Sequence, residues 1–166
     1  MIATERWLQP KILLPALLLL AWVIYFPGLG GPLLLDDLPQ LSGLLGQQDL
    51  SADELFASYG VSTSGPLGRP VSMATFIADA MLHGNDTWWW KQTNLLIHLL
   101  CGLLVFALVR SLYSIVTPGQ SRAPGLFALA IAAIWLLHPL NVSTVLYTVQ
   151  RMTGLSTLFV LAALYC

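Results

Sequence analysis

Charge is scarce in this chain. Only 9% of the 166 residues are charged, whereas 57% are hydrophobic, and so apolar a composition excludes an ordinary soluble domain. The two cysteines, Cys101 and Cys166, lie in apolar runs, so no disulfide framework or cysteine-based metal motif is evident. Internal repeats and low-complexity tracts are also absent from the sequence. These features predict an all-α membrane protein with several spans.

The few charges are distributed unevenly. The stretch 27–92 holds seven acidic residues but only two basic ones, Arg69 and Lys91. Because Lys and Arg are enriched in cytoplasmic loops, the positive-inside rule places the N-terminus in the cytoplasm and the acidic stretch outside. A basic N-terminus before an apolar core is also typical of a secretory signal peptide. Pro27, Pro32 and the apolar runs downstream favour a retained anchor.

Apolar runs define the expected membrane spans. We predict about four transmembrane helices, over about 12–29, 93–109, 124–137 and 152–166, with an outer loop over 30–92. The fourth run reaches Cys166 without a flanking charge. We therefore expect residues 1–166 to form a single N-terminal transmembrane region of a larger bundle.

The outer loop contains two predicted helices and an aromatic cluster. The Ser-Ala-Asp-Glu run at 51–54 has the pattern of a capping box, which begins a helix. Over 69–83, polar residues recur every three or four positions, which predicts an amphipathic helix at the interface or against the bundle. The tryptophan triplet at 88–90 indicates an aromatic belt at the membrane surface.

Two adjacent carboxylates are candidates for chemistry. Asp36 and Asp37 lie near the expected membrane boundary, where partial desolvation suits a general base that faces an outer cavity. Their alternative role is to cap a short helix or begin a solvated loop. Arg69 and Arg151 suit binding of a lipid-linked phosphate, with anchoring by snorkelling as the alternative. For Lys91 we favour anchoring.

Three histidines are scattered through the chain: His83, His98 and His138. His98 and His138 are placed to face an internal cavity as proton carriers or metal ligands. Their spacing matches no metal motif, so packing and hydrogen-bonding roles are favoured. Asn94 lies one turn before His98, and we expect this pair to bridge helices by hydrogen bonds.

Four separated motifs occur in a fixed order along the chain. They are LLLDDLPQL at 33–41, RPVSMATFIADAMLHG at 69–84, TNLLIHLL at 93–100 and HPLNVSTVLYTVQRMTGL at 138–155. Together they resemble the N-terminal region of polytopic C-superfamily (GT-C) glycosyltransferases. The closest resemblance is to the branch with C-terminal tetratricopeptide repeats, which includes transmembrane O-mannosyltransferases and bacterial relatives. The Val-Gln-Arg-Met run is more similar to the bacterial members.

The resemblance implies an inverting enzyme of protein glycosylation. It would move a sugar from a polyprenyl-phosphate donor to a hydroxyl of a protein or glycolipid acceptor on the outer face. Asp36 and Asp37 would be the catalytic candidates, and Arg69, His138 and Arg151 would bind substrate. The site would face the periplasm from a bacterial inner membrane, in contact with lipid and with no nucleic acid. No cofactor is firmly implied, and a divalent metal stays open because outer-loop acids serve as ligands or as a base.

A function without catalysis competes with this interpretation. The same helices could present an acidic loop to a partner during surface assembly or polysaccharide export. A small transporter fits less well, because the predicted span interiors lack Asp and Glu. As an isolated piece, this chain is expected to have too few walls to enclose a lipid-linked donor, so we expect activity only in the complete protein.

Overall fold

The computed structural model describes residues 10–45, 47, 50–60, 68–117 and 123–166. Every regular element in these ranges is a helix, so the predicted all-α class is confirmed for them. The charges at Glu5, Arg6, Asp49 and Arg122 lie outside the described residues. The elements are α2 (Pro10–Tyr25), η1 (Phe26–Gly28), α3 (Asp37–Leu41), α4 (Ala52–Tyr59), α5 (Pro70–His83), α6 (Thr87–Val116), α7 (Ala123–Leu136), α8 (Asn141–Leu146), η2 (Thr148–Gln150) and α9 (Arg151–Tyr165).

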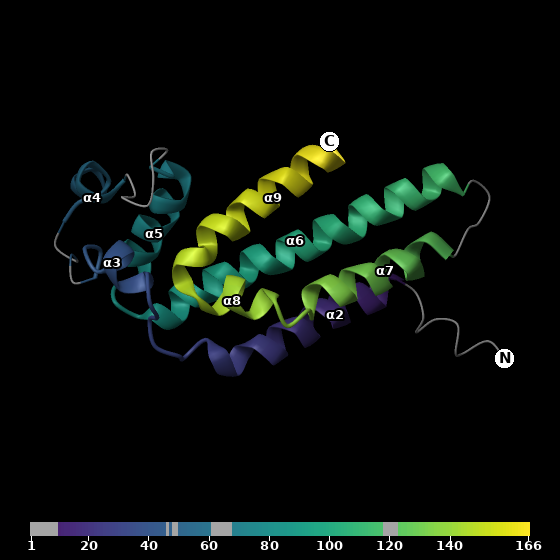
Figure 1. Ribbon diagram of the computed structural model, residues 1–166, viewed down its shortest axis with the longest axis horizontal. Coiled ribbons are helices and arrows are strands. Elements are labelled where there is room, and N and C mark those ends of the chain that lie inside the picture. The colour runs from purple at the N-terminus through teal and green to yellow at the C-terminus, as the bar shows by residue number, and fades with distance from the viewer. Residues whose placement is uncertain (1–9, 46, 48–49, 61–67, 118–122) are drawn as a thin grey trace.

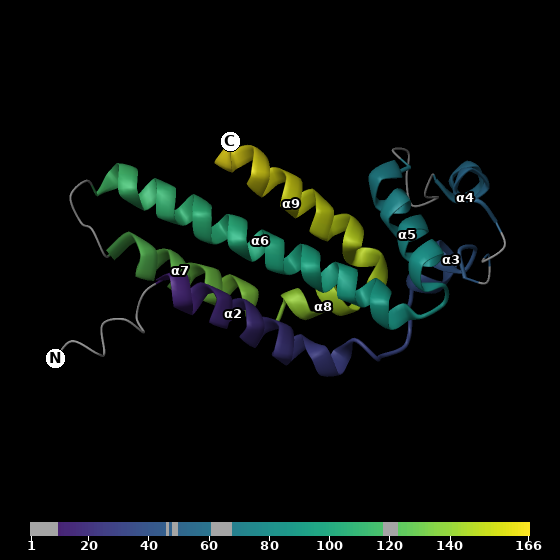
Figure 2. The ribbon, with the colours of Figure 1, turned by 180° about the vertical axis from the view of Figure 1, so that it is seen from behind.

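The helices form two regions. Helices α2, α6, α7 and α9 run lengthwise beside one another, and we call them the bundle (Figures 1 and 2). Helices α3, α4 and α5 gather at one end, and we call them the cap. The first turn of α2 lies toward the opposite end, with the last turn of α6 (Figure 2). The long helix α6 packs against both α7 and α9, and its first turns contact the cap.

Two stretches are long and apolar enough to cross a membrane. They are Pro10–Gly28, which joins α2 and η1, and Thr87–Val116, which is α6. Helices α7 and α9 have 14 and 15 residues and are shorter than a typical span. The structure therefore contains two candidate spans among its described residues, and the count of four stays a prediction.

Helix α7 ends well before the cap. The helix ends before His138-Pro139-Leu140, and the chain continues as the short α8 (Figure 1). It then reaches the cap at η2. At the break, the side chain of Asn141 donates a hydrogen bond to the Trp135 carbonyl at 2.7 Å, which satisfies a free carbonyl at the end of α7. The connection from α7 to α9 is thus built from the short helix α8 and the 3-10 turn η2 rather than from a simple turn.

Helices α4 and α5 begin where the sequence predicts, whereas α6 begins at Thr87 and not near position 93. The capping box at Ser51 and Glu54 is complete at the start of α4. Pro70 opens α5 as the first helical residue, where its missing N–H costs nothing. The Asp86 carboxylate accepts the Trp88 N–H at 3.1 Å and so caps α6.

The tryptophan triplet divides between core and surface. Trp90 has no exposed surface, packs against Phe76 in the cap core and donates to the Gly84 carbonyl at 3.1 Å. Trp90 is therefore a core residue and not part of the expected belt. Trp88 and Trp89 are at least partly exposed and form an edge-to-face pair with ring centroids 4.8 Å apart. They are the members that fit the expected aromatic belt.

Candidate functional site

Both acids and both arginines singled out from the sequence meet one stretch of chain. We call this stretch, which joins α8 to α9 through η2, the 147–152 segment. Asp36 and Asp37 bond to Tyr147, Thr148 and Val149, Arg69 contacts Met152, and Arg151 belongs to the segment itself.

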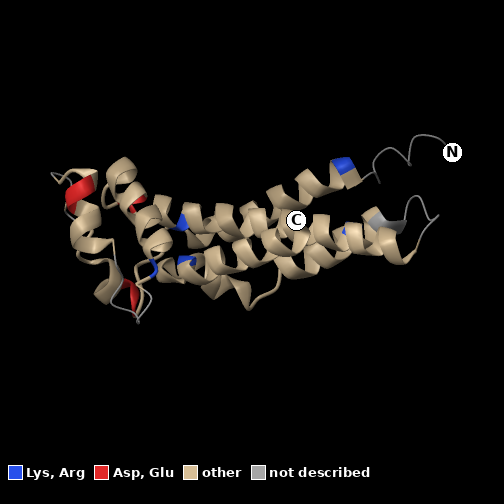
Figure 3. Cartoon of the chain, turned by 90° about the horizontal axis from the view of Figure 1, so that it is seen from above, with Lys and Arg blue, Asp and Glu red and all other residues tan. Residues whose placement is uncertain are grey.

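Acidic and basic residues are distributed differently along the length of the molecule. Among the residues that the structure describes, acidic ones lie only at the cap end, whereas basic ones lie at both ends and not in the middle of the bundle (Figure 3). The junction of cap and bundle, where the 147–152 segment lies, is the place where both signs meet. We therefore take this junction as the candidate functional site.

Asp37 is a buried acceptor. It has no exposed surface, and its Oδ1 accepts the Val149 N–H at 2.7 Å. Its Oδ2 accepts the Leu34 N–H at 3.0 Å and the Thr148 N–H at 3.4 Å. A carboxylate engaged by three backbone donors has little capacity left to accept a proton from a substrate. Asp37 instead joins the first loop to the 147–152 segment.

Buried Lys91 completes this attachment. Its ammonium donates to the carbonyls of Gly31 and Pro32 at 2.6 and 3.0 Å and interacts electrostatically with Asp37. The side chain is 1% exposed, so Lys91 points into the protein and does not snorkel to the surface. The sequence favoured a role in anchoring at the membrane surface. In the structure, Lys91 instead binds carbonyls of the loop that follows η1.

Arg151 is also buried, and its donors are largely used. Nη2 donates to Asp79 Oδ2 at 2.5 Å and to the Trp90 carbonyl at 2.7 Å. Nε donates to Asn94 Oδ1 at 2.7 Å, and Nη1 to Thr75 Oγ1 at 3.3 Å. The guanidinium carbon lies 4.1 Å from the centre of the Phe76 ring. Arg151 thus connects α5, α6 and α9, and most of its binding capacity is spent within the protein.

Asn94 carries this network to the backbone of the segment. Its amide nitrogen contacts the carbonyls of Val145, Tyr147 and Thr148 at 3.3, 3.4 and 3.0 Å. The expected helix-bridging role of Asn94 is confirmed, with α8 and η2 as its partners. We call Asp37, Asp79, Asn94 and Arg151 the buried network.

Asp36 differs from its neighbour in exposure. Its side chain is exposed, and its backbone N–H donates to the Tyr147 hydroxyl at 2.8 Å. Leu35, the residue before it, has a φ of 42°, which is left-handed backbone that L-residues with large side chains rarely adopt. The acid is therefore held at the surface by a strained turn on one side and a hydrogen bond on the other.

Arg69 has the same combination of exposure and strain. Its φ is 48°, its side chain is exposed, and its Nη1 donates to Met152 Sδ at 2.9 Å. Sulfur is a weak acceptor, and the only ion pair within the described ranges is that of Arg151 with Asp79. Leu35 and Arg69 are also the only described non-glycine residues with positive φ. We call Asp36 and Arg69 the exposed rim.

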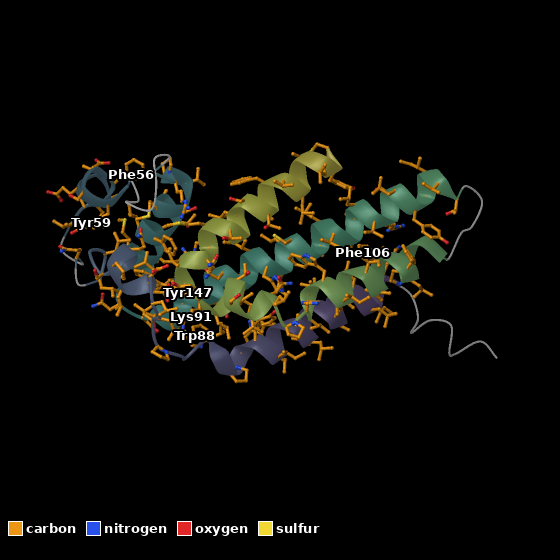
Figure 4. All side chains as sticks on the ribbon, in the orientation of Figure 1. Phe56, Tyr59, Trp88, Lys91, Phe106 and Tyr147 are labelled. Atoms are coloured by element: carbon orange, nitrogen blue, oxygen red, sulfur yellow. The ribbon has the colours of Figure 1, made fainter. Side chains whose placement is uncertain are left out.

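Tyr147 lies between the network and the rim. Partial burial, the dominant cause, raises the pKa of its hydroxyl, and the charges of Asp36 and Asp37 raise that pKa further. The phenol therefore stays protonated at neutral pH and can donate a hydrogen bond while it accepts one. Figure 4 shows Tyr147 and Lys91 where the cap meets the bundle.

His138 is placed away from the acids. It lies at the break between α7 and α8, where its Nδ1 accepts the Leu140 N–H at 3.3 Å, and α8 separates it from the 147–152 segment. It lines a surface hollow with Trp135, Leu140 and Asn141. The structure thus brings together four of the five predicted site residues and sets His138 apart.

A cavity of about 180 Å³ lies between α6 and α9. Arg151, His98 and Thr153 are among the residues that line it, and it shares Trp135 and Asn141 with the hollow beside His138. The His98 Nε2 lies 3.0 Å from the Leu136 carbonyl, so this nitrogen carries the proton of the neutral ring. The favoured hydrogen-bonding role of His98 is confirmed.

The described residues contain no group of three or more His, Cys, Asp or Glu side chains that could hold a metal ion. Asp36 and Asp37 are adjacent in sequence but have different environments, one exposed and one engaged by backbone donors. The acid pair therefore does not form a shared carboxylate site.

Two residues of this site could not be assigned from the sequence. Asp79 is 72 positions from Arg151, and only the predicted polar face of its helix marked it. Tyr147 carried no signal, because a tyrosine near a membrane boundary is common. Searches of known protein families, curated proteins and solved structures found no match to this chain.

Proposed function

We propose that this chain is the N-terminal part of an inverting membrane glycosyltransferase that moves a sugar from a polyprenyl-phosphate carrier to an acceptor hydroxyl on the outer face. The observation that carries the proposal is the exposed rim, an acid and an arginine that flank one segment and each follow or occupy left-handed backbone. Strain of this kind costs about 1–3 kcal/mol per residue and collects at functional sites.

The chemistry assigns one role to each rim residue. Asp36 accepts the proton of the acceptor hydroxyl as the new bond forms between that oxygen and the anomeric carbon. The bond from the anomeric carbon to the phosphate oxygen breaks, and the electron pair leaves with the polyprenyl phosphate. Arg69 binds the phosphate, whose oxygens match the guanidinium fork. The buried network, to which Arg151 belongs, holds the segment between them.

Two features of the bundle support a location in the membrane. Only 17% of the most apolar window of Pro10–Gly28 is buried, whereas a core helix of a soluble protein would be mostly buried. The remaining surface of α2 exposes large side chains such as Leu19, Val23 and Ile24, which suits contact with lipid. Ala21 and Tyr25 of the same helix pack into the bundle, which favours a retained helix over a cleaved leader.

Orientation and number of spans belong to the same proposal. The acidic cap lies at one end and Lys11 and Arg110 belong to the stretches at the other end, which fits a cytoplasmic N-terminus and a periplasmic cap. Helices α7 and α9 would serve as further, shorter spans beside α2 and α6. Together they would form the first part of a larger bacterial inner-membrane bundle.

The test uses the complete protein in detergent with polyprenyl-phosphate mannose, glucose and galactose as donors, and measures loss of the lipid-linked sugar. Asp36→Asn should abolish consumption while the protein still inserts and folds. Asp53→Asn is the matched control, because Asp53 is another exposed acid of the cap. Full consumption by Asp36→Asn would remove Asp36 as the base.

A noncatalytic membrane module for surface assembly or export is the second candidate. It is favoured by the buried network, in which Asp37, Asp79 and Arg151 act on the protein itself. On this alternative the complete protein consumes none of the three donors, and Asp36→Asn weakens capture of a partner instead. Donor consumption that depends on Asp36 would exclude it.

A further inference from the structure

Tyr147 connects the buried network to the exposed rim. Its hydroxyl accepts the backbone N–H of Asp36 at 2.8 Å, so the phenol lies directly beside this residue. A protonated phenol can accept from the amide and donate to the carboxylate at once. Tyr147 therefore holds the backbone of the residue that carries the proposed reacting group.

The backbone of Tyr147 is held by the buried network. It sits in extended backbone, φ −89° and ψ 109°, between α8 and η2. Its carbonyl accepts from Asn94 at 3.4 Å, and Asn94 is in turn held by Arg151 at 2.7 Å. The ring packs against the cap core. The backbone of Tyr147 thus has a fixed position while its hydroxyl bonds to Asp36 of the rim.

The loop that carries Asp36 needs such a support. Leu35 is 82% exposed and has left-handed backbone, so its own packing does little to maintain that conformation. Asp37 attaches the loop on the far side through Thr148 and Val149. Without the Tyr147 hydroxyl, the loop would stay attached at Asp37, but the Asp36 carboxylate would lose its fixed direction.

We propose that Tyr147 is a positioning residue that aims the Asp36 carboxylate at the acceptor hydroxyl. The inference rests on the proposed function, since it assigns a reacting group to Asp36. It goes further because it predicts a kinetic effect for Tyr147, to which the proposed function assigns no contact with donor or acceptor. Misplacement of a catalytic group by about 1 Å can lower the rate by about a hundredfold.

The test compares Tyr147→Phe with Tyr59→Phe in the complete protein, by the same consumption of polyprenyl-phosphate hexoses. Tyr59 is the matched control, because it too is partly buried against the cap core. We expect Tyr147→Phe to lower kcat by about tenfold to a hundredfold with little change in KM for the donor. Tyr59→Phe should leave both constants and the unfolding midpoint unchanged.

The outcomes separate the inference from the function beneath it. If the wild type consumes donor and Asp36→Asn does not, a wild-type kcat in Tyr147→Phe overturns the inference alone. A higher KM with unchanged kcat in Tyr147→Phe would also overturn it. If the wild type consumes no donor, the proposed function fails and the inference fails with it.

Discussion

The buried network and the exposed rim use the same kinds of residue for different ends. Each contains aspartate and arginine, and each contacts the 147–152 segment. The network bonds to the backbone of the segment, whereas the rim contacts its side chains from the protein surface. In the network, Asp37 and Arg151 are fully buried with several partners each. In the rim, Asp36 and Arg69 are exposed, with few partners.

The comparison shows that adjacency in sequence does not mean a shared role. Asp36 and Asp37 differ by one position, but a short helix begins there, so one carboxylate turns inward and the other outward. Buried polar groups must be satisfied by protein partners, and such groups are poor ligands for anything else. Exposure with few partners is therefore the better guide to a reacting group in this molecule.

The largest effect should follow from removing an arginine of the network. Arg151→Met leaves Asp79 buried at 6% exposure without its ion pair, and loss of one buried partner costs about 3 kcal/mol or more. Denaturant titration in mixed micelles measures the free energy of unfolding. Arg69→Met is the matched change in the rim and should alter it by at most about 0.5 kcal/mol. Equal losses in the two variants would contradict the division into network and rim.

The second effect compares the adjacent acids by the same substitution. Asp37→Asn replaces a charged acceptor of three backbone N–H groups by a neutral amide, which should lower the free energy of unfolding by about 2 kcal/mol. Asp36→Asn keeps the backbone bond to Tyr147 and should cost at most about 0.5 kcal/mol. The same titration distinguishes them. A larger loss for Asp36→Asn would reverse the assignments.

Much of the fold could be predicted from the sequence because its signals are local. Apolar runs, the capping box at Ser51 and the polar spacing over 69–83 each depend on residues within one or two turns. The helices formed at these places. The boundary of α6 was missed because an Asp86 cap extends the helix through the tryptophan triplet, although composition alone suggested a surface belt.

The site was less predictable because its contacts are long-range. The spacing within α5 showed that Asp79 shares a face with polar residues, but a polar face is usually expected to meet water. Here Ser72 and Asp79 face inward, because Arg151 provides a buried cation 72 positions later in the chain. No pattern of either helix alone contains that pairing.

A third and smaller effect tests the link between rim and network at Tyr147. The nearby negative charge of Asp36 raises the pKa of the Tyr147 hydroxyl, since it disfavours a tyrosinate. Asp36→Asn should therefore lower this pKa toward its ordinary value of 10.0, without reaching it, because burial is the main cause. Carbon-13 labelled tyrosine NMR follows the titration, with Tyr147→Phe to assign the signal. No shift in Asp36→Asn, or the same shift in Asp53→Asn, would contradict the contact.

The smallest effect concerns Glu54, an exposed acid like Asp36 that is engaged by its own helix like Asp37. Its side chain accepts from the Ser51 hydroxyl and backbone N–H at 2.7 and 2.9 Å, and these hydrogen bonds lower its pKa below the ordinary 4.5. Because the pKa of Glu54 is lowered in the folded protein, the capping box of Ser51 and Glu54 stabilises α4 above pH 4.5. This contribution is lost as the pH falls through the lower pKa of the folded state. The Ser51 amide signal in NMR should titrate with a midpoint below 4.5 in the wild type and not at all in Glu54→Gln. A midpoint at or above 4.5 would show that the hydrogen bonds are weak in solution. Solvent exposure alone would then be enough to weaken the hydrogen bonds of a carboxylate. The small number of partners of Asp36 would in that case result from its exposed position and would not indicate a catalytic role.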